Sequence, residues 1–287
     1  MNETIEKSFA KLNLALDVLS RRDDGYHELS MIMQSVELHD IITIKKTPKP
    51  DISISCNKYY IPTNEANIAY KSAKAFIDLL NERAGVEINI EKKIPVGAGL
   101  AGGSANAASV LLGLNKIFGN PFELEKLMEL GRSVGADVPF CMAAQMTGGN
   151  YCALAEGIGD KLTQIPNLTD VVYLLVKPKI SVSTRWVYEN LDVTKISRHP
   201  DIEKVVEGLA LGDISLVSQN TANVLEGVVL ARYPMIEKLK NEMRNSGAKF
   251  SLMSGSGSTV FGVFDDRRRA YKAYEYFEKS QKFVWMS

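Results

Sequence analysis

The amino-acid sequence predicts an α+β protein of two domains, and three observations support this. Strand-like patterns come first: apolar residues alternate with other types from Leu12 to Val18, and four further alternating runs follow before residue 95. Helical spacing dominates later, without the regular alternation of strand and helix that a parallel sheet requires. The 287 residues suffice for two ordinary domains, and a glycine-rich segment places a soft boundary near residue 155. We therefore expect domains at 1–155 and 156–287.

The predicted elements follow from apolar spacing and from the turn residues between them. Besides the first strand, strands are predicted at 30–38, 40–46, 51–56, 86–94, 170–178, 249–254, 258–264 and 282–286. Helices are predicted at 64–85, 121–135, 184–191, 201–209, 221–233, 235–247 and 267–280, with a further one after the glycine-rich stretch that begins at Pro95. The segment 136–140 is predicted to be a loop.

Composition and charge exclude several classes of protein. Lys plus Arg and Asp plus Glu number 34 each, which gives no general electrostatic reason to expect a nucleic-acid or membrane partner. The three cysteines lack metal-ligand spacing, which favours a reducing compartment and implies no structural zinc. No apolar run reaches the roughly 20 residues that span a bilayer. We expect a cytoplasmic protein, either a monomer or a homodimer.

The stretch "PVGAGLAGGSANAA", which starts at Pro95, has the features of a phosphate-binding loop. It follows a predicted strand and leads into a helix whose apolar face includes Ala107, Val110, Leu111 and Leu114. Its glycines allow backbone N–H groups to point inward, and a helix N-terminus favours an anion. No lysine follows Gly103, so the stretch does not match a P-loop. Taken alone, it is either a phosphate cradle or a tight packing turn.

Other polar residues have an ordinary structural explanation when each is considered alone. Asp137, in "GADVPF", fits a helix N-cap with Pro139 in the first turn. Lys11 and Asn13 share the face of the first strand opposite its leucines, where a solvated position is the usual one. Thr184 fits a helix cap or a turn. The segment "SGSGST", residues 254–259, fits a tight hairpin.

Five motifs in order along the chain resemble those of the GHMP kinase superfamily. They are "FAKLNLALDVLSRRDDGYHELSMIMQSVEL", "PVGAGLAGGSANAA", "GADVPF", "KPKISVSTRWVY" and "MSGSGSTVFGVF". The resemblance spans essentially the whole chain and is strongest to the branch that phosphorylates a cytidine diphosphate substrate for isoprenoid synthesis without mevalonate. It implies a GHMP kinase fold, with an N-terminal domain like the second domain of ribosomal protein S5 and a ferredoxin-like C-terminal domain.

The resemblance implies two catalytic residues and an ATP site. Asp137 would accept the proton of the substrate hydroxyl, and the positive charge of Lys11 would stabilise the transferring phosphoryl group. Backbone N–H groups of the glycine loop would hold ATP, with Mg²⁺ and without a direct side-chain metal cluster. The implied ATP-binding residues are Pro95, Val96, Gly97, Ala98, Gly99, Leu100, Ala101, Gly102, Gly103 and Ser104, with Asn67 and Lys92 as weaker candidates.

The resemblance also implies a substrate site and shows one departure. The implied substrate-binding residues are Asn13, Tyr26, His27, Thr184 and Tyr188, with the two tyrosines on either side of the cytosine ring and Gly255 and Gly257 shaping the site. Related kinases commonly have Ser or Thr where this chain has Ala105, so Ser104 or water would have to replace that hydroxyl. Two alternatives stay open, another small-molecule kinase of the superfamily and a non-catalytic nucleotide-binding relative. RNA binding by the S5-like fold is a remote third.

Overall fold

The structure is a computed structural model that describes residues 2–287, and its chain forms two compact units. The first unit contains residues up to 11, 35–96 and 101–150, and the second contains 12–34, 97–100 and 151–287. Strands β1 (Glu3–Arg21) and β2 (His27–Thr47) pair with each other, and each contributes residues to both units. The predicted division at residue 155 stays a prediction, and that position falls within strand β5 (Cys152–Gly157).

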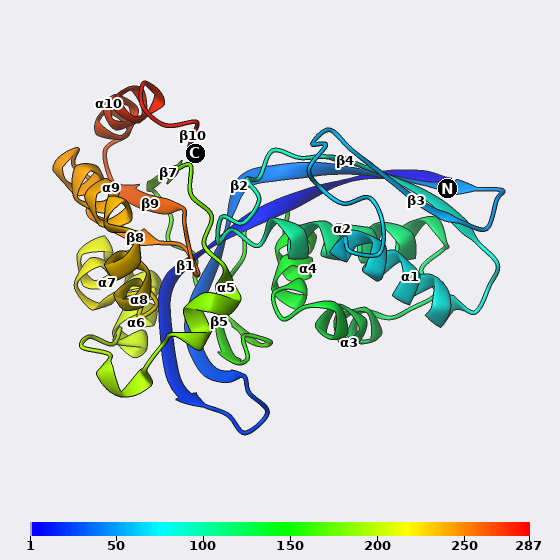
Figure 1. Ribbon diagram of the computed structural model, residues 1–287, viewed down its shortest axis with the longest axis horizontal. Coiled ribbons are helices and arrows are strands. Elements are labelled where there is room, and N and C mark those ends of the chain that lie inside the picture. The colour runs from blue at the N-terminus through cyan, green and yellow to red at the C-terminus, as the bar shows by residue number, and fades with distance from the viewer. Residues whose placement is uncertain (1) are drawn as a thin grey trace. The chain divides into compact units, whose positions relative to one another are not determined.

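In the first unit, the later part of β2 forms a sheet with two short strands (Figure 1). β4 (Gly85–Glu91) pairs antiparallel with β2, so that Ile88 lies opposite Ile44 and Ile90 opposite Ile42. β3 (Ile52–Cys56) pairs in parallel with β4. Ile42, Ile44 and Ile88 are fully buried, so one face of this sheet is covered by other elements.

The helices of the first unit lie on one side of that sheet (Figure 1). They are α1 (Ile68–Leu80), α2 (Gly102–Ile117), α3 (Leu124–Val134) and α4 (Val138–Met146). α3 packs against the other three helices. α2 packs against α1, α3 and α4, and it is buried along most of its length. A Cβ atom at Gly113 would lie 2.5 Å from Ile44 Cδ1, so glycine at this position lets α2 approach β2 closely.

The second unit contains the earlier part of β2 and a separate antiparallel sheet. β2 pairs with β5, which forms a hairpin with β6 (Lys161–Gln164). The separate sheet has the order β10-β7-β9-β8. Its strands are β7 (Val172–Lys177), β8 (Phe250–Met253), β9 (Val260–Phe264) and β10 (Phe283–Met286).

Helices α9 and α10 pack on the separate sheet, and α6 packs against α7. The helices of this unit are α5 (Thr184–Glu189), the 3-10 helix η1 (Val193–Lys195), α6 (Ile202–Leu211), α7 (Ile214–Asn220), α8 (Glu226–Arg232), α9 (Pro234–Asn245) and α10 (Arg267–Glu278). α8 packs against α9, and α9 packs against β8 and β9.

The structure differs from the predicted elements at several places. The two runs predicted at 30–38 and 40–46 form the single long strand β2. The first helix ends at Leu80 rather than at Gly85, because Asn81 adopts a left-handed conformation and its N–H closes the last turn on Ile77. The predicted loop 136–140 contains the start of α4, and residues 221–225 precede α8 instead of belonging to it. Strands β5 and β6 and helix α7 were not predicted.

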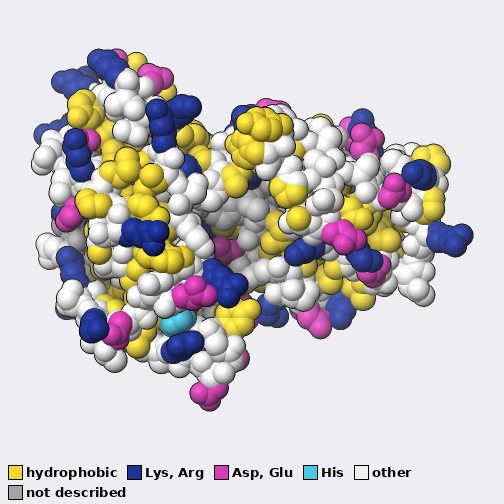
Figure 2. Space-filling model, viewed as in Figure 1, with side chains coloured by type: hydrophobic (Ala, Val, Ile, Leu, Met, Phe, Trp, Pro, Cys, Tyr) yellow, Lys and Arg dark blue, Asp and Glu magenta, His cyan; other side chains and the backbone are white. Residues whose placement is uncertain are grey.

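The surface carries charges of both signs. On the face that Figure 2 shows, Lys and Arg side chains are interspersed with Asp and Glu, in keeping with the equal numbers of the two kinds in the sequence. None of the helices formed by residues 2–287 combines the length and the apolar character needed to cross a membrane.

Candidate active site

The predicted catalytic pair is formed within the first unit. Lys11 Nζ lies 3.9 Å from Asp137 Oδ2, and the side chain of Lys11 is buried while that of Asp137 is about one-third exposed (31%). Asp137 occupies the N-cap position of α4, but its carboxylate makes no capping hydrogen bond. The chain therefore places a carboxylate at the start of α4 without using it as a cap, beside a buried ammonium group.

Cys141 lies near this pair, and its thiol is not ionised. Cys141 lies one turn into α4 and is fully buried. Burial raises the pKa of its thiol, and the nearby charge of Asp137 raises it further. The thiol is therefore neutral near pH 7 and adds no charge beside Asp137 and Lys11.

The glycine-rich stretch ends as the N-terminus of α2, where backbone N–H groups are available. The first bond of the helix runs from the Ala105 N–H to the Ala101 carbonyl oxygen at 2.9 Å. The N–H groups of Gly102, Gly103 and Ser104 consequently have no acceptor among residues 2–287. Ala101 is left-handed (φ +54°) and supplies no side-chain cap. Three unpaired donors and the positive end of a 16-residue helix suit a phosphate group.

In the second unit, Gly99 and Gly255 bring two loops into close contact. Gly99 has a φ of +73°, and a Cβ atom there would lie 2.0 Å from the Ser254 carbonyl oxygen. The Ser254 hydroxyl donates to the Gly99 carbonyl oxygen at 2.9 Å. Gly255 has a φ of +55°, and a Cβ atom there would lie 3.1 Å from the same carbonyl oxygen and 3.4 Å from Asn13 Oδ1. Only glycine permits this contact, so the "SGSGST" segment shapes this part of the glycine loop.

Lys92 lies inside a buried polar cluster of the first unit. Its ammonium donates to Asp40 Oδ2, to the Gly102 carbonyl oxygen at 3.1 Å and to Asn106 Oδ1 at 3.1 Å. Burial lowers the pKa of Lys92, and the adjacent charge of Asp40 opposes that shift. The other oxygen of Asp40 accepts from the N–H groups of Lys93 and Ile94, at 2.7 Å each. The cluster thus joins the start of α2 to the strand segment that precedes the loop.

The two weaker ATP candidates therefore already have interactions with the protein. Asn67 caps α1: its side chain accepts from the Ala69 N–H at 2.9 Å and donates to the Pro62 carbonyl oxygen at 2.7 Å. Lys92 directs its three N–H bonds to three protein oxygens. Direct contact of either side chain with ATP stays a prediction, and the bonds in the structure give both residues a role in holding the loops around the glycine-rich stretch.

Ala105 faces the interior of the protein, which bears on the hydroxyl that this chain lacks. Its side chain is fully buried, whereas Ser104 is half-buried. A Cβ atom built on Gly135 would lie 3.9 Å from Ser104 Oγ, so Ser104 is close to the turn that precedes α4. Of the two positions, only Ser104 presents its side chain toward solvent in this structure.

Two of the predicted substrate-binding residues, His27 and Tyr188, lie side by side within the second unit. The rings of His27 and Tyr188 lie 5.2 Å apart between centroids, tilted by 34°. Burial and the charge of Arg21 lower the pKa of His27, so the imidazole is neutral near pH 7 and offers one donor and one acceptor. Tyr26 is 61% exposed in the turn before β2. The structure brings Tyr188 beside His27 and leaves the ring of Tyr26 largely open to solvent.

The remaining predicted substrate contacts lie on β1 and α5. Asn13 is fully buried, and its side-chain amide donates to Met31 Sδ at 3.3 Å. Thr184 begins α5, but the helix is capped by the side chain of Ser183. The Thr184 hydroxyl instead lies 2.7 Å from the hydroxyl of Ser256, in the "SGSGST" segment. Thr184 therefore contacts the "SGSGST" segment and is not the helix cap that was considered.

Sequence reasoning missed the side chains that hold these loops. Asp40 was hidden within an alternating apolar run, and Asn106 interrupts the apolar face of α2. Asn223, which precedes α8, donates to the carbonyl oxygens of Met253 and Gly255. The signal available for each was a small polar residue at a position that the surrounding pattern marks as buried.

Comparison with known proteins agrees with these features. A family model described as the GHMP kinases N terminal domain matches residues 67–145, and one described as GHMP kinases C terminal matches 205–282. The 4-diphosphocytidyl-2-C-methyl-D-erythritol kinase of Clostridium perfringens is 47% identical over 96% of this chain and 94% of its own length. The enzyme of the same name from Clostridium novyi is 45% identical over 98% of both chains.

A solved structure supports the same assignment. The crystal structure of a 4-(cytidine 5'-diphospho)-2C-methyl-D-erythritol kinase is 30% identical to this chain, covers 99% of it and has a TM-score of 0.81. The match extends over 98% of that protein, so neither half of this chain lacks a counterpart. The chain therefore belongs to the GHMP kinases and, within them, to the family of the 4-diphosphocytidyl-2-C-methyl-D-erythritol kinases.

Proposed function

We propose that this protein transfers the γ-phosphoryl group of ATP to the 2-hydroxyl of 4-diphosphocytidyl-2-C-methyl-D-erythritol, a step in isoprenoid precursor synthesis without mevalonate. Full-length similarity to relatives of that name supports the substrate. The observation that carries the chemistry is the Lys11–Asp137 pair, in which the carboxylate stands at the start of α4 without capping it.

The pair accounts for the proton and for the developing charge. Asp137 orients the substrate hydroxyl and accepts its proton as the hydroxyl oxygen bonds to the γ-phosphorus. The bond between that phosphorus and the oxygen bridging to the β-phosphate breaks, and ADP departs. Lys11, whose ammonium lies 3.9 Å from the Asp137 carboxylate, stabilises negative charge on the transferring group. Most of the remaining catalysis is positioning.

The ATP phosphates fit the start of α2. The N–H groups of Gly102, Gly103 and Ser104, which have no acceptor among residues 2–287, can donate hydrogen bonds to anionic oxygens at the positive end of this helix. Mg²⁺, when bound, neutralises charge on the β- and γ-phosphates. Among residues 2–287 no three carboxylate, histidine or cysteine groups gather to hold it, so the phosphates, water and the Ser104 hydroxyl would provide its ligands.

The cytidine end of the substrate would lie against the aromatic pair of the second unit. Neutral His27 offers hydrogen bonds suited to a cytosine edge, and Tyr188 beside it offers a ring face. Tyr26 is exposed and available to cover the opposite face of the base. Asn13 and Thr184 would contact the rest of the substrate, and the glycines of the "SGSGST" segment would leave room for it.

A coupled assay of ADP release with the cytidine substrate tests the proposed function. The wild-type protein should release ADP only when both substrates are present, and folded Asp137→Asn should lose nearly all of this activity. A parallel panel with homoserine and mevalonate tests whether another superfamily substrate is preferred. No ADP release from folded wild-type protein with any of the three would point to a non-catalytic nucleotide-binding protein.

A further inference from the structure

Asn223, in the segment before α8, donates hydrogen bonds to the backbone at the start of the "SGSGST" segment. This side chain is 3% exposed, and both N–H bonds of its amide are used. They donate to the Met253 carbonyl oxygen at 2.7 Å and to the Gly255 carbonyl oxygen at 2.8 Å. The amide oxygen accepts from the Leu225 N–H at 3.0 Å, which fixes the orientation of the side chain. Asn223 therefore restrains two carbonyl groups on either side of Ser254.

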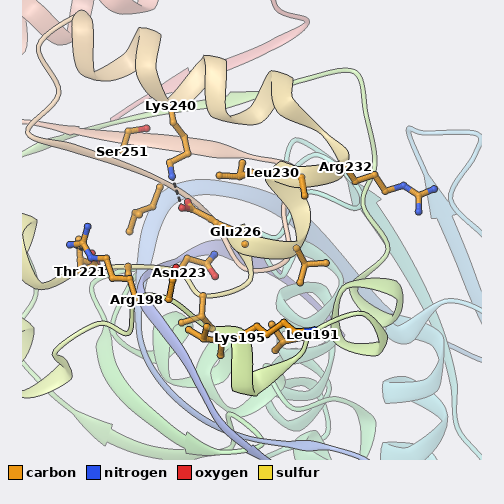
Figure 3. A pocket seen from close by; sticks show the side chains of 18 of the residues that line it. Leu191, Lys195, Arg198, Thr221, Asn223, Glu226, Leu230, Arg232, Lys240 and Ser251 are labelled. Atoms are coloured by element: carbon orange, nitrogen blue, oxygen red, sulfur yellow. Dashed lines mark hydrogen bonds and ion pairs between the residues drawn. The ribbon is translucent and has the colours of Figure 1, made fainter.

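Glu226, at the start of α8, accepts a hydrogen bond from a backbone N–H group beside the same segment, that of Met253. One carboxylate oxygen accepts from the Met253 N–H at 2.7 Å, and the other is paired with Lys240 of α9. The side chains of Glu226 and Lys240 are both largely buried, so this pair is weakly screened by solvent. Figure 3 shows the Glu226 carboxylate directed toward the Lys240 ammonium. The backbone of Met253 is thus held through both its N–H and its carbonyl group.

A cavity lies behind these contacts. It has a volume of about 1010 Å³ within the second unit, and Asn223, Glu226 and Lys240 are among the residues that line it (Figure 3). Met253 and Ser254 do not line this cavity and are themselves fully buried, so the cavity borders the side chains that hold the segment and not the segment itself.

On its other side, the held segment contacts residues of the proposed active site. Gly255 lies against the Gly99 carbonyl oxygen and Asn13 Oδ1. The same region is joined to β1, because the Leu16 N–H donates to the Ala222 carbonyl oxygen at 2.9 Å and the Val224 N–H donates to the Leu16 carbonyl oxygen at 3.0 Å. Asn13 is three residues before Leu16 on this strand. The hydrogen bonds therefore fix the turn relative to both the glycine loop and the substrate strand.

We infer that Asn223 and Glu226 are positioning residues for the phosphoryl transfer: they fix the Met253–Gly255 turn against Gly99 and Asn13. This inference rests on the proposed assignment of those residues to the ATP and substrate sites. When the turn is loosened, the groups that bind the substrates are still present, but they are held less precisely. Small displacements of reacting groups lower the rate steeply. The effect should therefore appear in kcat more than in KM.

The test compares variants that differ in the bonds they retain. Asn223→Asp keeps the acceptor for Leu225 but replaces both donors by an oxygen facing two carbonyl groups, and Asn223→Ala removes all three bonds. Glu226→Gln keeps an acceptor for the Met253 N–H, whereas Glu226→Ala does not. Glu237→Gln, at an exposed position of α9, is the matched control.

We expect kcat to fall roughly tenfold to a hundredfold in both Asn223 variants and in Glu226→Ala, with KM for either substrate changed less than about threefold. Glu226→Gln keeps an acceptor for the Met253 N–H but loses the charge pairing with Lys240, so its kcat should fall less than that of Glu226→Ala, and Glu237→Gln should keep the wild-type rate. Amide hydrogen exchange of residues 253–257 should accelerate in the slow variants. If Asn223→Ala does not fold, Glu226→Ala carries the same comparison.

Two results would overturn the inference. One is a folded Asn223→Ala protein with kcat within twofold of wild type. The other is an equal loss of kcat in Val205→Ala, a core variant of α6, at a matched loss of thermal stability, which would show a general effect of destabilisation. Failure of the proposed function is distinguishable, because wild-type protein would then not turn over the cytidine substrate while the exchange of residues 253–257 could still respond to the variants.

Discussion

Replacing Lys11 should slow phosphoryl transfer without unfolding the protein. Its ammonium is 3.9 Å from the Asp137 carboxylate, and at this distance two unit charges interact by about 4 kcal/mol at an effective dielectric constant of about 20 and by about 1 kcal/mol in bulk water. The Lys11 side chain is 7% exposed and that of Asp137 is 31% exposed, so the site lies between these limits. Since about 1.4 kcal/mol corresponds to tenfold in rate, we expect kcat to fall about a hundredfold.

Lys11→Met is the preferred variant because it keeps most of the buried aliphatic volume, and Lys11→Ala provides a second measurement. Steady-state turnover should be measured by coupled ADP release, with thermal unfolding as a check of folding. Lys74→Met is a matched control: Lys74 and Asp78 form a closer pair, at 3.1 Å, but both side chains are more than half exposed. Because this pair is exposed to solvent, its removal should leave both kcat and thermal stability essentially unchanged.

A double-mutant cycle then tests whether Lys11 acts together with Asp137. If the ammonium serves the carboxylate and the charge forming beside it, Lys11→Met combined with Asp137→Asn should cost much less than the product of the separate losses. Near-normal kcat in folded Lys11→Met, or full multiplication of the two losses, would refute this role for Lys11.

Three further outcomes are expected. Gly99→Ala should be poorly folded or inactive, because its Cβ would lie 2.0 Å from a carbonyl oxygen at a φ of +73°. Gly119→Ala, also at positive φ but with open space around it, should keep its activity. Circular dichroism and ADP release compare the two variants. Tyr188→Ala should weaken cytidine-substrate binding roughly tenfold by calorimetry, and unchanged affinity would exclude its proposed contact. Burial lowers the pKa of His27 from 6.5, so as the pH falls this residue is protonated in the unfolded chain before it is protonated in the folded protein. Stability should therefore decrease as the pH drops below about 6.5. His27→Gln should reduce that decrease, as measured by thermal unfolding.

The sequence predicted most strands and helices because their apolar spacing is regular. It could not predict the burial of β1, where the residues opposite the leucines, including Asn13 and Asp17, are also buried. Alternation identifies one apolar face, but only the tertiary structure shows what covers the other face. The hairpin of β5 and β6 was missed for a related reason: its glycine-rich surroundings indicated a linker, whereas Gly157 and Gly159 form its turn at positive φ.

Candidate site residues were predictable where a motif surrounds them and unpredictable where their partners are distant in sequence. Asp137 was predicted through "GADVPF"; in the structure it occupies the N-cap position without a capping bond, and its catalytic role stays a prediction. Asp40 acts on the backbone of residues 93 and 94, and Asn223 acts on that of residues 253 and 255. The local pattern can mark such a residue as a buried polar group, but it does not report which distant backbone groups the side chain contacts.

Asp40 and Asn223 address the same physical problem with opposite chemistry. A glycine-bearing loop has few side chains to pack, so its conformation must be fixed by hydrogen bonds from outside. Before α2 the groups to be held are N–H groups and an ammonium, and a carboxylate, Asp40, accepts from them. At the turn formed by Met253–Gly255, two of the groups to be held are carbonyls, and the side-chain amide of Asn223 donates to both. Exchanging the two side-chain types, as Asp40→Asn and Asn223→Asp, would place like groups against each other, so each isosteric change should loosen its own loop although the volume is preserved.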